Sequence, residues 1–134
     1  MTLAYRSDAL LRSLASLHRD APEILGSAIL THDGLVIASY PPGWEGDIHA
    51  PAGGENVAAM AAVVVGLAEK TLTRLDQGAL EQVLMAGERG TVAVFPASAD
   101  SALALLITKE AKLGLILHAA AQAAEQIRSI IDNR

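Results

Sequence analysis

The stretch NVAAMAAVVVGLA, residues 56–68, decides the fold, because it carries no charged side chain over thirteen residues. In a helix over about 55–75, at about 100° per residue, apolar side chains occupy two opposite sides. One side, the expected core face, holds Val57, Met60, Ala61, Val64, Ala68, Thr71, Leu72 and Leu75. The other holds Ala59, Ala62, Val63 and Gly66, followed by Glu69, Lys70 and Thr73. A chain of 134 residues with one sheet can cover one such side, so we expect a second copy to cover the other; the alternative is its own long loop.

Composition restricts the fold class and the partners. The length fits one domain, residues 1–134. Hydrophobic residues make up 51% of the chain and aromatic residues 3%, so the core is built from Ala, Val, Leu and Ile, and bases have few rings to stack on. The net charge of −5 repels phosphate backbones. We therefore expect no nucleic-acid partner.

The chain has no cysteine, which excludes disulfides and thiolate chemistry and fits a reducing compartment. The first eight residues are polar and acidic too early for a signal peptide. The longest uncharged stretch is shorter than the roughly 18–20 residues of a membrane-spanning helix. We expect a cytoplasmic protein without membrane insertion.

Outward from the middle helix, periodicity and turn residues divide the rest of the chain. Asp33-Gly34 between two β-branched runs indicates a hairpin, and Gly78 a glycine cap after the middle helix. The expected elements are a helix at 6–19, strands at 27–31 and 35–39, a loop at 41–53, a helix at 55–75, strands at 80–86, 91–96 and 102–108, and a helix at 113–132. The expected fold class is α/β (α+β), a five-stranded mostly antiparallel sheet in the order αββαβββα, with the middle helix on one face and the terminal helices on the other.

Several segments in this order match one known family. They are LLxxL at 10–14, GSAILTxDGLVIAS at 26–39, the alanine-rich middle helix, GxxAVFP at 90–96, LALL at 103–106 and LGLIL at 113–117. On these segments the chain resembles the Roadblock/LC7 domain. The resemblance implies a homodimer with antiparallel middle helices and third strands paired edge to edge. We therefore expect the dimer interface to contain Ala58, Ala59, Ala62, Val63, Gly66, Val83 and Met85.

The resemblance also implies a small Ras-like GTPase as partner, whose nucleotide cycle the family modulates, sometimes as a GTPase-activating protein. Polar residues of the middle helix are the candidates for a partner-binding platform beside the dimer axis: Glu55, Glu69, Lys70, Thr73 and Arg74. The alternative is that they are the solvated ends of a helix. Arg74 has the chemistry of an arginine finger, but the resemblance does not require one.

Other residues give little support for an enzyme. Gly53-Gly54-Glu55 lacks the Gly-Lys-Ser/Thr of a phosphate loop and places a carboxylate where phosphate would bind. The four histidines lack metal-ligand spacing, and Asp47-x-His49 is the one close acid–imidazole pair. We expect no cofactor, no metal and no catalysis. Trp44 is either an interface anchor or packed back on its own sheet, the second being favoured. The alternative function is a ligand-sensing or signalling adaptor without a GTPase; a small hydrolase is a more distant third.

Overall fold

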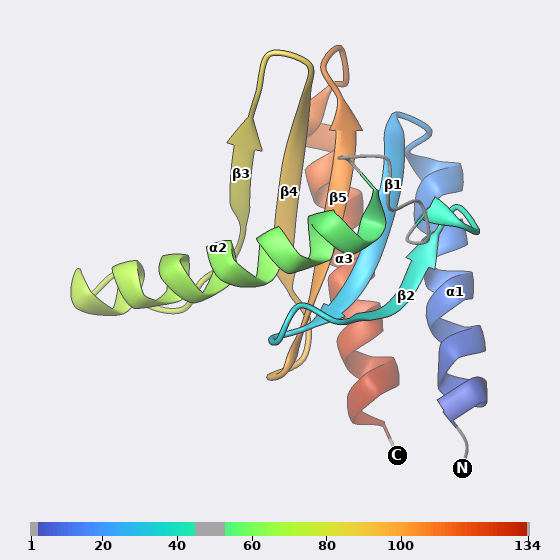
Figure 1. The fold of residues 1–134 in the computed structure, drawn as a ribbon, viewed down its shortest axis with the longest axis horizontal. Coiled ribbons are helices and arrows are strands. Elements are labelled where there is room, and N and C mark those ends of the chain that lie inside the picture. The colour runs from blue at the N-terminus through green and yellow to red at the C-terminus, as the bar shows by residue number, and fades with distance from the viewer. Residues whose placement is uncertain (1–2, 45–52, 134) are drawn as a thin grey trace.

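The computed structural model describes residues 3–44 and 53–133. Three helices and five strands follow one another in the expected order, αββαβββα (Figure 1). They are α1 (Leu3–Asp20), β1 (Ile24–Thr31), β2 (Val36–Tyr40), α2 (Gly54–Arg74), β3 (Val83–Ala86), β4 (Gly90–Pro96), β5 (Ser101–Thr108) and α3 (Leu113–Asp132).

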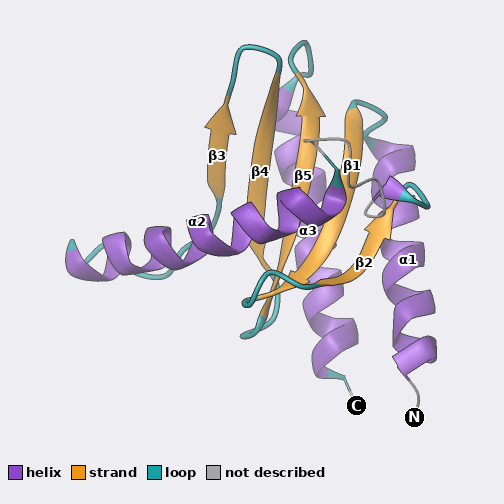
Figure 2. Cartoon of the chain, in the orientation of Figure 1, coloured by secondary structure: helices purple, strands orange, loops and turns teal. Residues whose placement is uncertain are grey.

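The strands form one sheet in the order β2-β1-β5-β4-β3, and every neighbouring pair is antiparallel. Helices α1 and α3 cover one face of this sheet, and α2 crosses the other (Figures 1 and 2). The expected fold class and the division of helices between the faces are confirmed. Strands β2 and β3 are the two edges, and α2 connects them.

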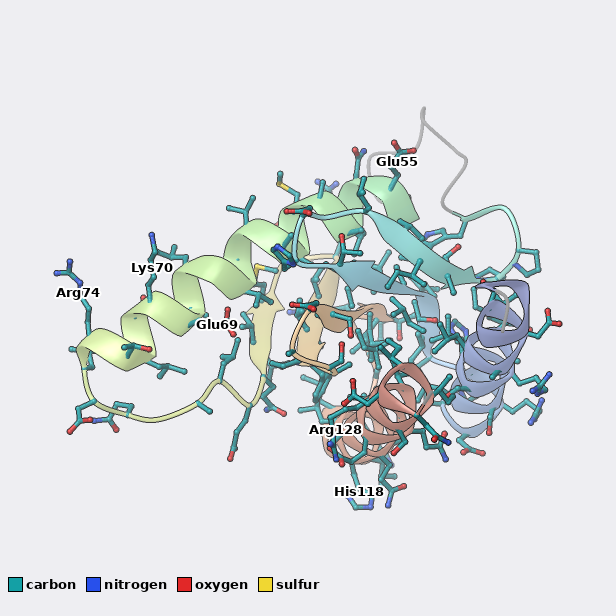
Figure 3. The ribbon with its side chains drawn as sticks, turned by 90° about the horizontal axis from the view of Figure 1, so that it is seen from below. Glu55, Glu69, Lys70, Arg74, His118 and Arg128 are labelled. Carbon is teal, nitrogen blue, oxygen red and sulfur yellow. The ribbon has the colours of Figure 1, made fainter. Side chains whose placement is uncertain are left out.

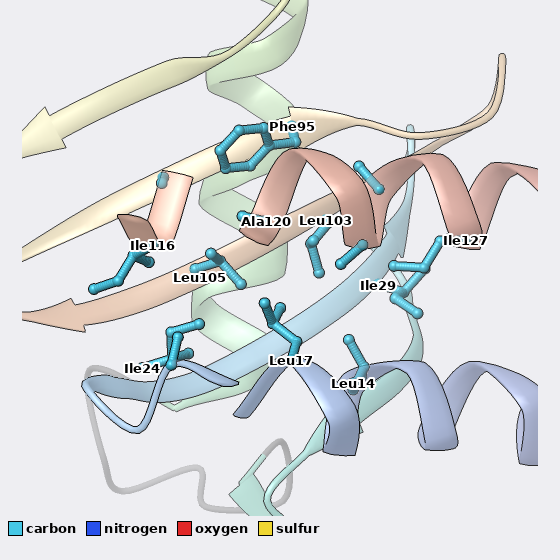
Figure 4. Close-up of a cluster of buried hydrophobic side chains, with 14 of the residues drawn as sticks. Leu14, Leu17, Ile24, Ile29, Phe95, Leu103, Leu105, Ile116, Ala120 and Ile127 are labelled. Atoms are coloured by element: carbon cyan, nitrogen blue, oxygen red, sulfur yellow. The ribbon is translucent and has the colours of Figure 1, made fainter. Parts of the chain in front are cut away.

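The larger core lies between the sheet and the pair α1 and α3 (Figure 4). Alternate residues of β5, Leu103, Leu105 and Ile107, point into it and are fully buried. Ala120 and Ile127 of α3 meet them, and the small alanine allows the helix to approach the sheet closely. Each fully buried leucine or isoleucine here contributes about 1.5–3 kcal/mol.

The smaller core lies under α2. Its buried members on the sheet are Leu30, Val94, Ala102 and Ala104, and those on the helix are Val57, Ala58 and Ala61. All fully buried residues of α2 fall in its first eight positions, Gly54 to Ala61. The helix then continues past β3, the last strand on that side (Figure 1). Half of α2 is therefore a core helix and half is not.

The hairpin between β1 and β2 forms as predicted. The amide of Gly34 donates to the carbonyl of Thr31 at 2.9 Å, and Gly34 has φ +87°. A Cβ on Gly34 would lie 3.2 Å from Cα of Ala59 on α2. Glycine is needed here both for the left-handed turn and for the close approach of the turn to the helix.

The end of α2 differs from the prediction. The left-handed residue that forms its cap is Asp76, with φ 56°; Gly78 also has a positive φ, 91°, but lies two residues beyond the cap. The amides of Asp76 and Gln77 donate to the carbonyls of Thr73 and Leu72, which is a Schellman motif. Aspartate tolerates this conformation better than most residues, so the cap forms two residues earlier than the glycine suggested.

Candidate functional site

From Met60 to its end, α2 exposes large apolar side chains. Met60, Val63 and Leu67 are 61%, 65% and 66% exposed, and Leu75, which follows the last residue of the helix, is 63% exposed. Met60 was expected on the core face, and that prediction is wrong. The helix is rotated so that Val57, Ala58 and Ala61 face the sheet, and Met60 lies to one side of this contact.

The predicted interface residues separate into two groups. Ala58 is 0% exposed beneath its own sheet, so it has no surface to offer a second copy, and this part of the prediction is wrong. Ala62 is half-buried against the smaller core. Ala59, Val63 and Gly66 are exposed, and a Cβ on Gly66 would meet no atom within 4 Å.

Four apolar residues of α2 form a stripe that we call the α2 seam: Met60, Val63, Val64 and Leu67. Their spacing of three and four residues places them on one side of the helix. The seam borders an open groove of about 440 Å³ between α2 and the start of β3. The groove is lined mainly by Val64, Leu67, Ala68, Leu72, Leu80, Val83 and Leu84.

Strand β3 adds an unpaired backbone edge to this surface. It pairs with β4 on one side, and the structure places no other described strand on its outer side. Val83 pairs with Val94, which belongs to the core under α2, so Val83 and Met85 both face the α2 side of the sheet. Both are half-buried. The predicted interface strand therefore lies beside the α2 seam, with hydrogen-bonding groups available at its edge.

The predicted partner-binding residues are all exposed, but they do not form one cluster within the chain. Lys70 and Arg74 extend away from the body near the end of α2, whereas Glu69 lies on another side of the helix (Figure 3). Thr73 belongs to the same last turns, where its side chain is also exposed. Glu55 is in the first turn, roughly 28 Å away from Arg74 at 1.5 Å per residue.

A polar contact that the sequence analysis missed lies under α1. Nε2 of His18 is 2.8 Å from Oγ of Ser27, and its ring lies 4.6 Å from that of Tyr40. Burial lowers the pKa of His18, which favours the neutral imidazole in the fold. The available signal was position, because His18 follows Leu14 and Leu17 on the buried side of α1.

The other candidate sites resolve differently. Trp44 packs against the smaller core and over Gly26, whose Cβ would lie 2.4 Å from its ring, as the favoured prediction expected. Asp47 and His49 lie outside the described residues. Within 3–44 and 53–133, no group of three or more His, Cys, Asp or Glu side chains could hold a metal ion.

The expectation that no segment is long enough to span a membrane has to be corrected for α2. At 21 residues it is long and apolar enough to cross a bilayer by length and composition, and only 17% of its most apolar window is buried in the fold. Counting uncharged residues alone missed this, because few charges are spread over the remaining turns.

Comparisons with known proteins identify the family. The family model described as Roadblock/LC7 domain matches residues 10–107. The uncharacterized protein MJ1340 of Methanocaldococcus jannaschii is 36% identical over 107 residues, which is 80% of this chain and 87% of that protein.

Two solved structures share the fold. The gliding protein MglB of Thermus thermophilus has a TM-score of 0.81 at 17% identity, covering 96% of this chain and 93% of that one. A Roadblock/LC7 domain from Streptomyces avermitilis has a TM-score of 0.75 at 22% identity, covering 87% and 92%. The chain belongs to the Roadblock/LC7 domain family.

Proposed function

We propose that this member of the Roadblock/LC7 family is a non-catalytic, cytoplasmic homodimer that binds a small Ras-like GTPase and modulates its nucleotide cycle. It would serve as a scaffold or a GTPase-activating protein. The observation that carries the proposal is the exposed α2 seam beside the free edge of β3. A soluble chain rarely leaves several large apolar side chains about two-thirds exposed along one helix without a partner.

In the proposed dimer, the two α2 helices lie antiparallel and the two β3 strands pair. Because α2 extends past β3, its second half would cover the sheet of the other copy, including Val83 and Met85. The seam is symmetric about its middle, so Met60 of one copy would face Leu67 of the other, and Val63 would face Val64. Each large side chain buried in this way contributes about 1–2 kcal/mol before ordering costs.

Charge favours the antiparallel arrangement. Glu55 stands in the first turn of α2 and Arg74 in the last. Antiparallel helices bring these opposite charges together between copies, whereas parallel helices would bring Arg74 next to Arg74. Such a pair adds little affinity on an exposed surface, but like charges oppose the wrong orientation.

The outer side of the paired helices would form the GTPase platform. It combines Glu55, Lys70, Thr73 and Arg74 from both copies into a surface that one copy does not contain. Glu69 belongs to it only in part, since it is turned toward the body (Figure 3). A GTPase bound to this surface could have its switch regions reshaped by the contact. The platform would then not need to supply a catalytic residue.

Copurification tests the partner. Tagged full-length chain is purified from its native host, and any GTPase that stays bound is assayed for GTP turnover with and without it. We expect Lys70→Glu with Arg74→Glu to weaken binding about tenfold or more while the dimer mass stays unchanged. The conservative pair Lys70→Arg with Thr73→Ser is the matched control. Equal GTPase binding by the charge-reversed and wild-type chains would refute the platform.

A further inference from the structure

A cavity of about 210 Å³ lies on a different side of α2 from the seam. It is bounded by the middle of α2, the end of β1 and the turn between β4 and β5. Its lining includes the apolar residues Leu30, Val65 and Ala102 and the ionisable residues His32, Glu69 and Asp100. The cavity shares no residue with the α2 seam. A dimer that forms through the seam therefore does not use the residues that line the cavity.

The inner wall of the cavity is apolar and fixed. Leu30 and Ala102 are 1% and 6% exposed and belong to the smaller core, against which Val65 packs. The turn beside them is closed by hydrogen bonds: the amide of Ala97 donates to the Ser101 carbonyl at 3.0 Å, and the amide of Ser98 donates to Oγ of Ser101 at 3.0 Å. The hollow is therefore held by backbone contacts and by the core.

Two acidic residues from separate elements, both exposed, are among the residues that line the cavity. Glu69 comes from α2 and Asp100 from the turn, whose carbonyl accepts a 3.0 Å hydrogen bond from the amide of His32. Neither carboxylate makes a hydrogen bond or ion pair within the described part of the chain. His32, the third ionisable lining residue, lies 3.4 Å from the exposed Asp33. Lysine and arginine are absent from this described lining, and the neighbouring Lys70 extends away (Figure 3).

We propose that this cavity binds a short aliphatic cation: an ammonium or guanidinium group between Glu69 and Asp100, on a hydrocarbon stem against Leu30, Val65 and Ala102. The carboxylates favour a cation and oppose an anion. The volume corresponds to about seven waters at roughly 30 Å³ each, which fits a ligand of about six to eight non-hydrogen atoms and excludes a nucleotide. The proposal does not depend on the GTPase.

Titration of the ¹⁵N-labelled full-length chain tests this site. Butylammonium chloride and butylguanidinium chloride are added, with sodium chloride at matched ionic strength and the uncharged 1-butanol as controls. We expect saturable shifts of amides in 31–32, 65–69 and 98–101 with both cations. N-acetyl-lysine methylamide is the third probe: binding at least as tight as butylammonium assigns the cation to a protein side chain, and weaker binding assigns it to a free amine.

Variants separate recognition from nonspecific attraction. Asp100→Asn and Glu69→Gln should each weaken butylammonium binding about threefold to tenfold, and the double variant should abolish saturation. Glu110→Gln, an exposed carboxylate outside the cavity, is the matched control and should bind like wild type. The proposal is overturned if 1-butanol binds as well as butylammonium, if neither cation gives saturable shifts, or if the double variant binds normally. Asp100 is outside the proposed GTPase platform, so its result is distinct from a failure of that proposal.

Discussion

The two halves of α2 have similar compositions and opposite surroundings. From Gly54 to Ala61 the helix packs on its own sheet, with Ala58 and Ala61 fully buried. Beyond Ala61 the helix packs on its sheet only in part, through Ala62 and Val65, and then continues past the sheet edge. Val63 and Leu67 are about two-thirds exposed. Alanine and valine in the first half stabilise the single chain. In the second half, apolar residues of the same kind contribute little to the stability of the single chain. The apolar surface that they expose therefore points to a contact with another molecule.

Leu67→Glu gives the largest expected effect. A dimer places this residue in the interface twice by symmetry, so the variant buries two unpaired charges. We expect association at least 100-fold weaker, with the fold retained, as measured by sedimentation equilibrium and circular dichroism. Leu115→Glu on α3 is the matched control, because Leu115 is 76% exposed away from α2. A Leu67→Glu chain that associates as tightly as the Leu115→Glu chain contradicts the interface.

Ala61→Leu tests the covered half of α2. Ala61 is 0% exposed, so three added carbon atoms must displace the sheet or the helix. We expect a loss of about 1–3 kcal/mol in the free energy of unfolding, measured by urea denaturation at fixed chain concentration. Ala59→Leu, on the exposed side of the same half, should change it much less. Equal losses in the two variants would mean that the helix is not packed as described.

Gly66→Ala sharpens the comparison in the second half. A Cβ there meets no atom within 4 Å, and alanine is the better helix former. We expect a gain of about 0.5–1 kcal/mol in unfolding free energy, with an unchanged dimer. Gly66→Leu should also leave the dimer intact. Dissociation of the Gly66→Leu variant would instead place the interface on the alanine–glycine side predicted from the sequence.

The smallest effect concerns His18, on the far face of the sheet. Burial lowers its folded-state pKa below the ordinary 6.5, so the unfolded chain binds the proton more readily. The contribution of neutral His18 is complete above about pH 6.5 and is lost as the pH falls through and below that value. Wild type should therefore lose more stability than His18→Gln between pH 7 and 5 in thermal denaturation. Parallel pH profiles of wild type and His18→Gln would exclude this role. Because His18 lies on the far face of the sheet, the pH change should affect the two halves of α2 alike.

Local patterns predicted most of the fold. Asp33-Gly34 between β-branched runs determines its hairpin, and periodicity located all three helices to within a few residues. The orientation of α2 could not be obtained this way. Its apolar residues surround the helix. Their positions at 100° per residue therefore do not show whether Met60 or Ala58 faces the sheet. That choice depends on the crossing angle and on where the sheet ends.

The candidate sites were harder still. The sequence predicted that α2 has a second apolar side, on Ala59, Ala62, Val63 and Gly66. Val63 is an exposed large residue as predicted, whereas the other two, Met60 and Leu67, were not placed on that side. The cavity between Glu69 and Asp100 joins residues 31 positions apart through tertiary packing, which no local pattern reports. The pairing of His18 with Ser27 likewise required the packing of α1 on β1.

Isotope-filtered NOE spectroscopy on an equimolar mixture of labelled and unlabelled chain tests the central claim most directly. If a second copy covers the far half of α2, the methyl groups of Leu67 will show intermolecular contacts to Met60 and other seam residues. If Leu67 shows contacts only within its own chain at concentrations where the sample is fully assembled, the claim is wrong.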